Sequence, residues 1–229
     1  MALDWRLLEE ADRYGAAFLR LYRWDPPCLS FGRNEPALAR YDRAAIERLG
    51  LDVVRRPTGG RAVWHEHEVT YAVAAPVAAF GSLRESYRAI HERLVAAIRT
   101  LGAEASLASA RPPVRLSAGP GPCFAVPVGG EVVVKGKKVV GSAQVRHGSA
   151  FLQHGSILLD GSQDMVNAVS RQPSALTQAT SLSAVLGRSV TFAEVVAAVV
   201  RSWNDEPCPS DRPTVRPSVF SDPSWTWRR

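Results

Sequence analysis

Residues 55–73, RRPTGGRAVWHEHEVTYAV, contain the densest group of residues that could bind a ligand. Two arginines and a Gly-Gly pair lead straight into a predicted strand. Because Gly59 and Gly60 have no Cβ, the backbone there can approach a ligand and donate its amides to a carbonyl or phosphate oxygen. Thr-Gly-Gly also occurs in tight hairpins that bind nothing, so the motif alone leaves both interpretations open.

The run His65-Glu66-His67-Glu68 has the residue types of a metal site. On a strand the two histidines share one face while the glutamates point away, and two ligands do not close a zinc site. We therefore expect no metal here. We interpret His65 as a hydrogen-bonding group beside the glycine turn.

A second segment, residues 136–160, reads GKKVVGSAQVRHGSAFLQHGSILLD. Its small residues Gly141, Ser142 and Ala143 could leave room for a slim acyl chain. Lys138 is the notable charge. Strand alternation from the apolar Val139 places Lys138 on the opposite face, so a solvated lysine is the alternative to a functional one.

The three cysteines lie far apart and lack CxxC spacing, which indicates neither a disulfide framework nor a zinc knuckle. Any special cysteine would be a free thiol. Cys28 falls in an apolar strand, and we expect it in the core. Cys208 lies between prolines in the tail, where no role is indicated.

Periodicity predicts the elements that position these segments, in a mostly antiparallel sheet. A Thr191–Glu194 capping box opens the last long helix. Strands 16–24 and 28–33 are joined by the turn Asp25-Pro26-Pro27, and the strands of 131–148 hinge at Lys135-Gly136. The predicted helices are 2–14, 42–50, 84–102 and 192–203. The predicted strands are 16–24, 28–33, 51–56, 61–76, two within 131–148, and 150–160. The segment 103–122 is a predicted loop or linker.

Composition allows one sizeable core: the chain has 229 residues, 46% of them hydrophobic. No apolar stretch is long enough to cross a membrane, and the charged amphipathic start is unlike a secretory signal, so we expect a cytoplasmic protein that binds no membrane. The net charge of +6 suits an acidic partner, although a source that favours Arg and Ala would give the same excess. No basic run interleaves with aromatic residues, which argues against nucleic acid.

Segments along nearly the whole chain together resemble one known family. They are the opening MALD helix, YRWDPPCLSFG, RRPTGGRAVWHEHEVTY, CFAVP, GKKVVGSAQ, LQHGSILLD and the closing DPSWTWRR. They resemble the catalytic domain of the lipoate–protein ligase A and octanoyltransferase family, a branch of the biotin/lipoate ligase superfamily. The resemblance implies a single α+β domain over residues 1–229, with mixed, mostly antiparallel sheets flanked by helices around an acyl tunnel, and with 205–229 as a C-terminal tail.

In that family the Arg-Arg-X-X-Gly-Gly segment and the lysine of the GKK turn border a narrow acyl tunnel. The match implies that the tunnel is lined here by Arg56, Thr58, Gly59, Gly60, His65, Lys138, Gly141, Ser142, Ala143, His154 and Gly155.

Two branches of the family use different chemistry: one activates free lipoate with ATP, and others move an acyl group through a cysteine thioester. The ligases usually have a third glycine where this chain has Arg61, and they often depend on an accessory C-terminal domain for which no residues remain here. Cys123-Phe124 resembles the nucleophile position of the octanoyltransferases typical of Gram-positive bacteria. Gln144 and Gln153 also resemble that branch.

The resemblance therefore implies Cys123 as nucleophile and Lys138 as an electrostatic and proton-transfer group, with no cofactor. A thiol with a pKa near 8.5 is only a few per cent thiolate at neutral pH, so a nearby ammonium would help. A thiolate can take the acyl group from one thioester before passing it to an amine.

The implied donor is octanoyl acyl carrier protein. The implied acceptors are lipoyl domains such as glycine cleavage H protein or 2-oxoacid dehydrogenase E2, and both classes of partner are commonly acidic. We expect a monomer. Three alternatives stay open: an ATP-dependent lipoate–protein ligase, an amidotransferase that moves acyl groups between lipoyl domains, and a non-catalytic protein that binds acyl groups or lipoyl domains.

The chain departs from the family at its start, because relatives usually carry a strand and further residues before the MALD helix. We expect either a misassigned start or an unpaired sheet edge. The segment 103–122 also differs in composition from the charged segments of relatives.

Overall fold

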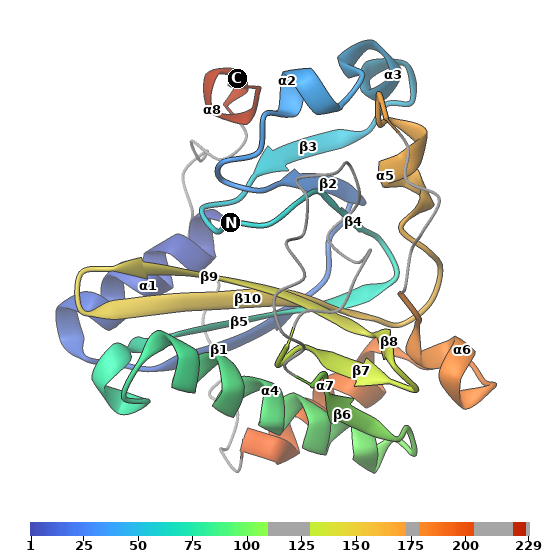
Figure 1. Ribbon diagram of the computed structural model, residues 1–229. Coiled ribbons are helices and arrows are strands. Elements are labelled where there is room, and N and C mark those ends of the chain that lie inside the picture. The colour runs from blue at the N-terminus through green and yellow to red at the C-terminus, as the bar shows by residue number, and fades with distance from the viewer. Residues whose placement is uncertain (110–128, 173–178, 204–221, 228–229) are drawn as a thin grey trace.

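The computed structural model describes residues 1–109, 129–172, 179–203 and 222–227 (Figure 1). A four-stranded antiparallel sheet runs through the middle of the molecule. Its strands, in spatial order, are β1 (Phe18–Tyr22), β5 (Glu68–Pro76), β10 (Ala150–Leu158) and β9 (Val140–His147).

Helices cover both faces of this sheet, as the alternation along β5 requires. Ala72 and Ala74 point toward Leu8 of α1 (Ala2–Tyr14), whereas Tyr71 and Val73 belong to the larger core. Two long helices pack on that second face, α4 (Leu83–Thr100) and α7 (Phe192–Trp203) (Figure 1). The large sheet is therefore buried between α1 on one face and the α4–α7 pair on the other.

A second sheet lies above the first in Figure 1 and has the order β3 (Asp52–Arg55), β2 (Cys28–Phe31), β4 (Val63–His65). β2 pairs with β3 in parallel and with β4 antiparallel. Around it lie the short helices α2 (Ala37–Arg40), α3 (Arg43–Arg48), α5 (Asp164–Ala168) and α8 (Pro223–Thr226).

A third sheet contains β6 (Ala105–Leu107), β7 (Val132–Val134) and β8 (Lys137–Lys138). The hinge predicted at Lys135-Gly136 is confirmed: both residues have positive φ, 49° and 74°, as a two-residue hairpin turn of the type I′ class requires. The remaining described elements are the 3-10 turn η1 (Val77–Ala79) and α6 (Leu182–Leu186).

Helix ends follow the predicted signals. Gly15 ends α1 in the left-handed conformation, and the predicted capping box is confirmed. The Thr191 hydroxyl accepts from the Glu194 amide over 3.2 Å, while Glu194 Oε2 accepts from the Thr191 amide over 2.8 Å.

Three predicted element boundaries are wrong. The strand predicted over 61–76 breaks at Glu66 and His67, because β4 joins the small sheet and β5 the large one. The predicted loop 103–122 contains β6, since residues 105–107 pair with β7; its part from residue 110 onward lies outside the described residues. The predicted pair of strands in 131–148 is three strands, because Val139 leaves the ladder between β8 and β9.

The mostly antiparallel character of the sheets is confirmed, with β2 and β3 as the parallel pair. Of the helices that the structure describes, none has the length and apolar content needed to cross a membrane.

Candidate active site

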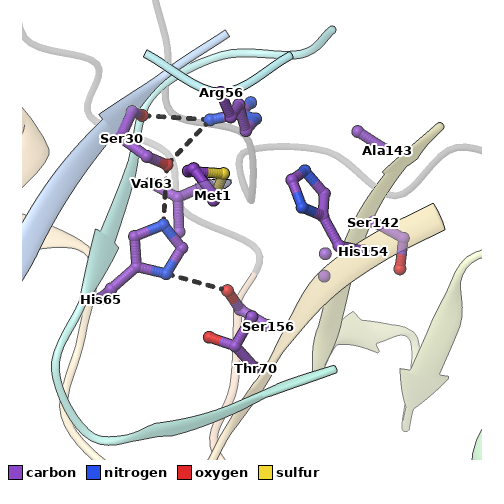
Figure 2. A pocket seen from close by; sticks show the side chains of 12 residues that line it. Met1, Ser30, Arg56, Val63, His65, Thr70, Ser142, Ala143, His154 and Ser156 are labelled. Carbon is purple, nitrogen blue, oxygen red and sulfur yellow. Dashed lines mark hydrogen bonds between the residues drawn. The ribbon is translucent and has the colours of Figure 1, made fainter. Parts of the chain in front are cut away.

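A cavity lies between the large sheet and the small sheet (Figure 2). The small sheet contributes Ser30 of β2 and His65 of β4, and the large sheet contributes its strands β5, β9 and β10. The empty space within and in front of the cavity measures about 340 Å³, a volume that includes open solvent. Its lining residues are Met1, Ser30, Arg56, Val63, His65, Thr70, Gly141, Ser142, Ala143, His154, Gly155 and Ser156.

His65 forms the centre of a hydrogen-bonded chain on one wall (Figure 2). Arg56 donates to Ser30 Oγ over 3.0 Å, and a guanidinium can only donate. The Ser30 hydroxyl can then donate to His65 Nε2, 2.7 Å away, which leaves His65 Nδ1 to donate to Glu68 Oε1 over 2.8 Å. The interpretation of His65 as a hydrogen-bonding group is confirmed.

His154 forms a second chain of the same kind on β10. Its Nε2 lies 2.6 Å from Thr58 Oγ1, and its Nδ1 lies 3.5 Å from Asp4 Oδ2. Asp4 also accepts from Arg20 over 2.6 Å and from the Tyr22 hydroxyl over 2.8 Å. The cavity thus has two buried chains in which a hydroxyl, an imidazole and a carboxylate follow one another.

The charge states of this second chain follow from burial and neighbours. Burial by itself raises the pKa of Asp4, but the hydrogen bond with His154 and the nearby positive charges, Arg20 among them, outweigh it and hold the pKa well below its usual range. Burial lowers the pKa of His154, and Asp4 offsets only part of this. At neutral pH the pair is therefore a carboxylate beside a neutral imidazole.

The Gly59-Gly60 turn has a structural reason that the sequence does not display. A Cβ on Gly32, at the end of β2, would lie 1.9 Å from the carbonyl oxygen of Gly60, so the two segments touch backbone to backbone. Arg56 reinforces the turn by donating to the carbonyl of Gly59 over 2.9 Å and to that of Arg61 over 2.6 Å. The expectation that Thr58, Gly59 and Gly60 line the cavity is not met, since they are not among its described lining residues.

Beneath β9 a buried polar cluster supports Ser142 from the α4 side. Ser142 Oγ lies 2.6 Å from the Tyr71 hydroxyl and 2.8 Å from His91 Nε2, and Gln153 donates to the Tyr71 hydroxyl over 2.9 Å. Burial lowers the pKa of His91 to about 4, with a smaller contribution from the charge of Lys138. The cluster was not predicted from the sequence. The signal that could have indicated it is His91, a histidine on the apolar face of the predicted helix 84–102.

Lys138 is buried, with its Nζ 2.5 Å from Glu131 Oε1, and both side chains are nearly inaccessible. The solvated alternative for this lysine is therefore wrong. The expectation that Lys138 lines the cavity is also not met among the described lining residues, because its ammonium points to Glu131, which immediately precedes β7. The charge of Lys138 contributes to the lowered pKa of His91.

Of the residues expected to line the tunnel, the structure brings seven together around one cavity: Arg56, His65, Gly141, Ser142, Ala143, His154 and Gly155. Whether they bind an acyl group stays a prediction. Gly155 is needed for packing, since a Cβ there would lie 2.3 Å from the Gly141 carbonyl oxygen. Ser30, Thr70 and Ser156 were not predicted, because single hydroxyls in apolar strands give no periodic signal.

Cys28 is buried in β2, as expected for a core residue, and burial raises the pKa of its thiol to about 12. Cys123 and Cys208 lie outside the described residues.

The two histidines of the His65–Glu68 run do not share a face, contrary to the expectation from strand alternation. The strand ends at His65, so His65 and Glu68 are buried while Glu66 and His67 are exposed at the turn. In the part of the chain that the structure describes, no group of three or more His, Cys, Asp or Glu residues is placed to hold a metal ion.

The family model for the lipoyl protein ligase A/B catalytic domain matches residues 1–204. The chain belongs to this family. The ligase A/B domain therefore includes all three described sheets and every residue that lines the cavity.

Curated relatives of this ligase A/B chain include proteins named octanoyltransferase LipM. The one from Moorella thermoacetica is 38% identical over 218 residues, covering 89% of this chain and 80% of the relative. Those from Carboxydothermus hydrogenoformans and Kyrpidia tusciae are 44% and 49% identical, and their matches cover 64% and 68% of this chain. Those two matches span only 55% and 59% of the relatives' own lengths.

Solved structures of ligases share the fold. A lipoate-protein ligase A bound with ATP superimposes with a TM-score of 0.71 at 23% identity, and a putative lipoate protein ligase from T. acidophilum with bound lipoic acid superimposes with 0.73 at 22%. Each comparison covers 89% of this chain and 77% of the other. The expected α+β fold of the lipoate ligase type is confirmed.

Proposed function

We propose that this chain is an octanoyltransferase of lipoate biosynthesis, which moves an octanoyl group from acyl carrier protein to the target lysine of a lipoyl domain. The observation that carries the proposal is the similarity to octanoyltransferase LipM of Moorella thermoacetica, 38% identical across most of both chains. The cavity between the sheets supports it, because seven of the residues that the family resemblance assigns to the acyl tunnel line it.

The proposed acceptors are lipoyl domains such as glycine cleavage H protein or the E2 subunit of a 2-oxoacid dehydrogenase. A solved structure with the same fold is that of a bipartite lipoate protein ligase and its E2 lipoyl domain from Thermoplasma acidophilum. Net charge +6 would favour approach to acidic partners of this kind. We propose that the enzyme acts as a monomer in the cytoplasm.

In the proposed mechanism Cys123 attacks the carrier thioester, and the acyl group moves to the cysteine while the carrier thiol leaves. The acceptor lysine then attacks the Cys123 thioester, forming an amide and releasing the thiol. Lys138 stabilises the developing oxyanion and takes part in transfer of the proton that the amine loses. For this role Lys138 has to turn from Glu131 toward the reacting carbonyl.

The experiment mixes octanoyl carrier protein, a lipoyl domain and the enzyme without ATP. The expected result is a lipoyl domain heavier by one octanoyl group, with the modification on its target lysine. Transfer that requires ATP and free acid would establish the ligase alternative instead. Transfer only from an octanoylated lipoyl domain would establish the amidotransferase, and binding without transfer in all three assays would establish the non-catalytic alternative.

A further inference from the structure

The pairing of β9 with β10 fixes the order in which residues line the cavity, starting from the Lys138 end. Lys138 lies just before β9, and the next residue, Val139, accepts a hydrogen bond from the Leu158 amide over 3.1 Å. Moving along the strands away from this point, the paired residues are first Gly141 and Ser156, then Ser142 and Gly155, and finally Ala143 and His154. If the acyl carbonyl reacts near Lys138, as the proposed function requires, the hydrocarbon tail points toward Ala143 and His154.

Along the β9–β10 pair, His154 and Ala143 are the lining residues farthest from Lys138, and the His154 side chain is held by hydrogen bonds. Figure 2 shows its imidazole between Met1 and Ala143. Thr58 Oγ1 lies 2.6 Å from Nε2, and Asp4 Oδ2 lies 3.5 Å from Nδ1. His154, Thr58 and Asp4 are all nearly inaccessible to solvent. To move His154 aside, a ligand would have to break these contacts, separating His154 from the buried Thr58 hydroxyl and from Asp4, which would keep its bonds from Arg20 and Tyr22.

Behind His154 the same face of β10 continues into packed apolar side chains. Leu152 belongs to a buried cluster with Leu8 and Ala11 of α1, and Val145 packs against it. The space beyond the imidazole is therefore filled by side chains of the core. Removal of the imidazole would create room for a short extension of a chain and no more.

We propose that His154, held by Thr58 and Asp4, is the end wall that limits the transferred acyl group to octanoyl length. This specificity role rests on the proposed function and goes beyond it, because it assigns chain-length selection to one side chain. A chain two methylenes longer has to displace a buried hydrogen-bonded group, which typically lowers affinity about tenfold or more.

Purified variants test the proposal with hexanoyl, octanoyl and decanoyl carrier proteins as donors and a lipoyl domain as acceptor. The measured quantity is the ratio of kcat/KM between donors. The wild type should prefer octanoyl to decanoyl by about tenfold or more, and His154→Ala should lower that preference about tenfold. The matched control His154→Gln, whose amide can still bond Thr58, should keep most of the preference for octanoyl.

A second variant changes Ala143, which lies on β9 opposite His154. Ala143 pairs with His154 across the β9–β10 ladder and lines the cavity, so Ala143→Leu should shorten the available space. Its preference should shift toward hexanoyl. This variant keeps the proposal testable if His154→Ala does not fold, because an unchanged ratio of hexanoyl to octanoyl in folded Ala143→Leu would overturn it.

Equal loss for all three donors in folded His154→Ala would also overturn the proposal, since a purely structural role predicts that pattern. The measurements distinguish failure of the end wall from failure of the proposed function. A wild type that transfers octanoyl and decanoyl equally well contradicts the end wall but leaves the proposed function standing. A wild type that transfers no acyl group from any carrier contradicts the proposed function itself.

Discussion

At the scale of single residues, the pairing of Lys138 with Glu131 alters what replacement of the lysine should do. Both side chains are buried, so Lys138→Ala removes the ammonium that faces the buried Glu131 carboxylate. Breaking a buried pair in this way typically costs about 3–5 kcal/mol. Loss of activity in Lys138→Ala could therefore come from the lost chemical role of the lysine, from the lower stability of the fold, or from both.

We expect Lys138→Ala to lower the transfer rate by about 10²–10⁴-fold, the usual effect of losing a positioned proton-transfer group, and to lower the melting temperature as well. The double variant Lys138→Met with Glu131→Gln should regain stability but not activity. Lys137, which is exposed on the same strand, provides the matched control, and Lys137→Ala should change little. Turnover close to wild type in either Lys138 variant would contradict the proposed role of Lys138.

A pH prediction follows from His91, whose pKa burial lowers from 6.5 to about 4. Because the folded-state pKa is below the unfolded value, the unfolded chain binds more protons between these two pH values. The free energy of unfolding should therefore be highest above pH 6.5 and should fall as the pH drops toward 4. The difference between 6.5 and about 4 corresponds to about 3 kcal/mol.

His154 acts in the same direction, since burial lowers its pKa too. Urea titrations at a series of pH values measure the effect, and His91→Gln should flatten the slope between pH 6.5 and 4. A wild-type stability that stays constant or rises over this range as the pH falls would contradict burial of neutral imidazoles.

At the scale of elements, the contact between the end of β2 and the glycine turn gives a test of backbone packing. A Cβ on Gly32 would lie 1.9 Å from the Gly60 carbonyl oxygen, whereas a Cβ on Gly59 meets no described atom within 4 Å. Gly32→Ala should therefore lower the free energy of unfolding by about 1–3 kcal/mol, as overpacking usually does. Gly59→Ala should change it little; equal stability loss in both variants by urea denaturation would contradict the assigned contact.

The sequence predicts those elements whose signals are local. The helix over 2–14, the Lys135-Gly136 hinge and the capping box at Thr191 are all found, because caps and turns depend on neighbouring residues. The break at Glu66 and His67 was missed, because both halves of that apolar segment have strand composition. Only the pairing of β4 and β5 in different sheets decides where it breaks, and pairing is not local.

In the candidate site, too, residues with local sequence signals were predicted and residues placed by non-local contacts were not. Arg56, His65, His154 and the Gly141–Ala143 segment come from motifs and reach one cavity. Asp4 was missed because its partner His154 is distant in the chain. Glu131 was missed because its partner Lys138 could equally have faced solvent. A carboxylate in an amphipathic helix gives no indication in sequence that it will be buried.

At the scale of the whole molecule, we propose that residues 1–229 form a single domain. The large sheet contacts α1, α4 and α7, while the cavity joins it to the small sheet. Unfolding by urea should then be one cooperative transition, with the same midpoint by tryptophan fluorescence and by circular dichroism. Two separated transitions, or a fragment starting after residue 103 that folds alone, would contradict a single domain.

The central claim is transfer through a thioester on Cys123, and intact mass tests it most directly. After mixing with octanoyl carrier protein and no nucleotide, the enzyme should gain one octanoyl mass that hydroxylamine removes and that a lipoyl domain discharges. Cys28→Ala should acylate normally, since Cys28 is buried in β2, and Cys208→Ala should do the same, whereas Cys123→Ala should gain nothing. An enzyme that gains no adduct, needs ATP with free acid and tolerates Cys123→Ala would contradict the claim.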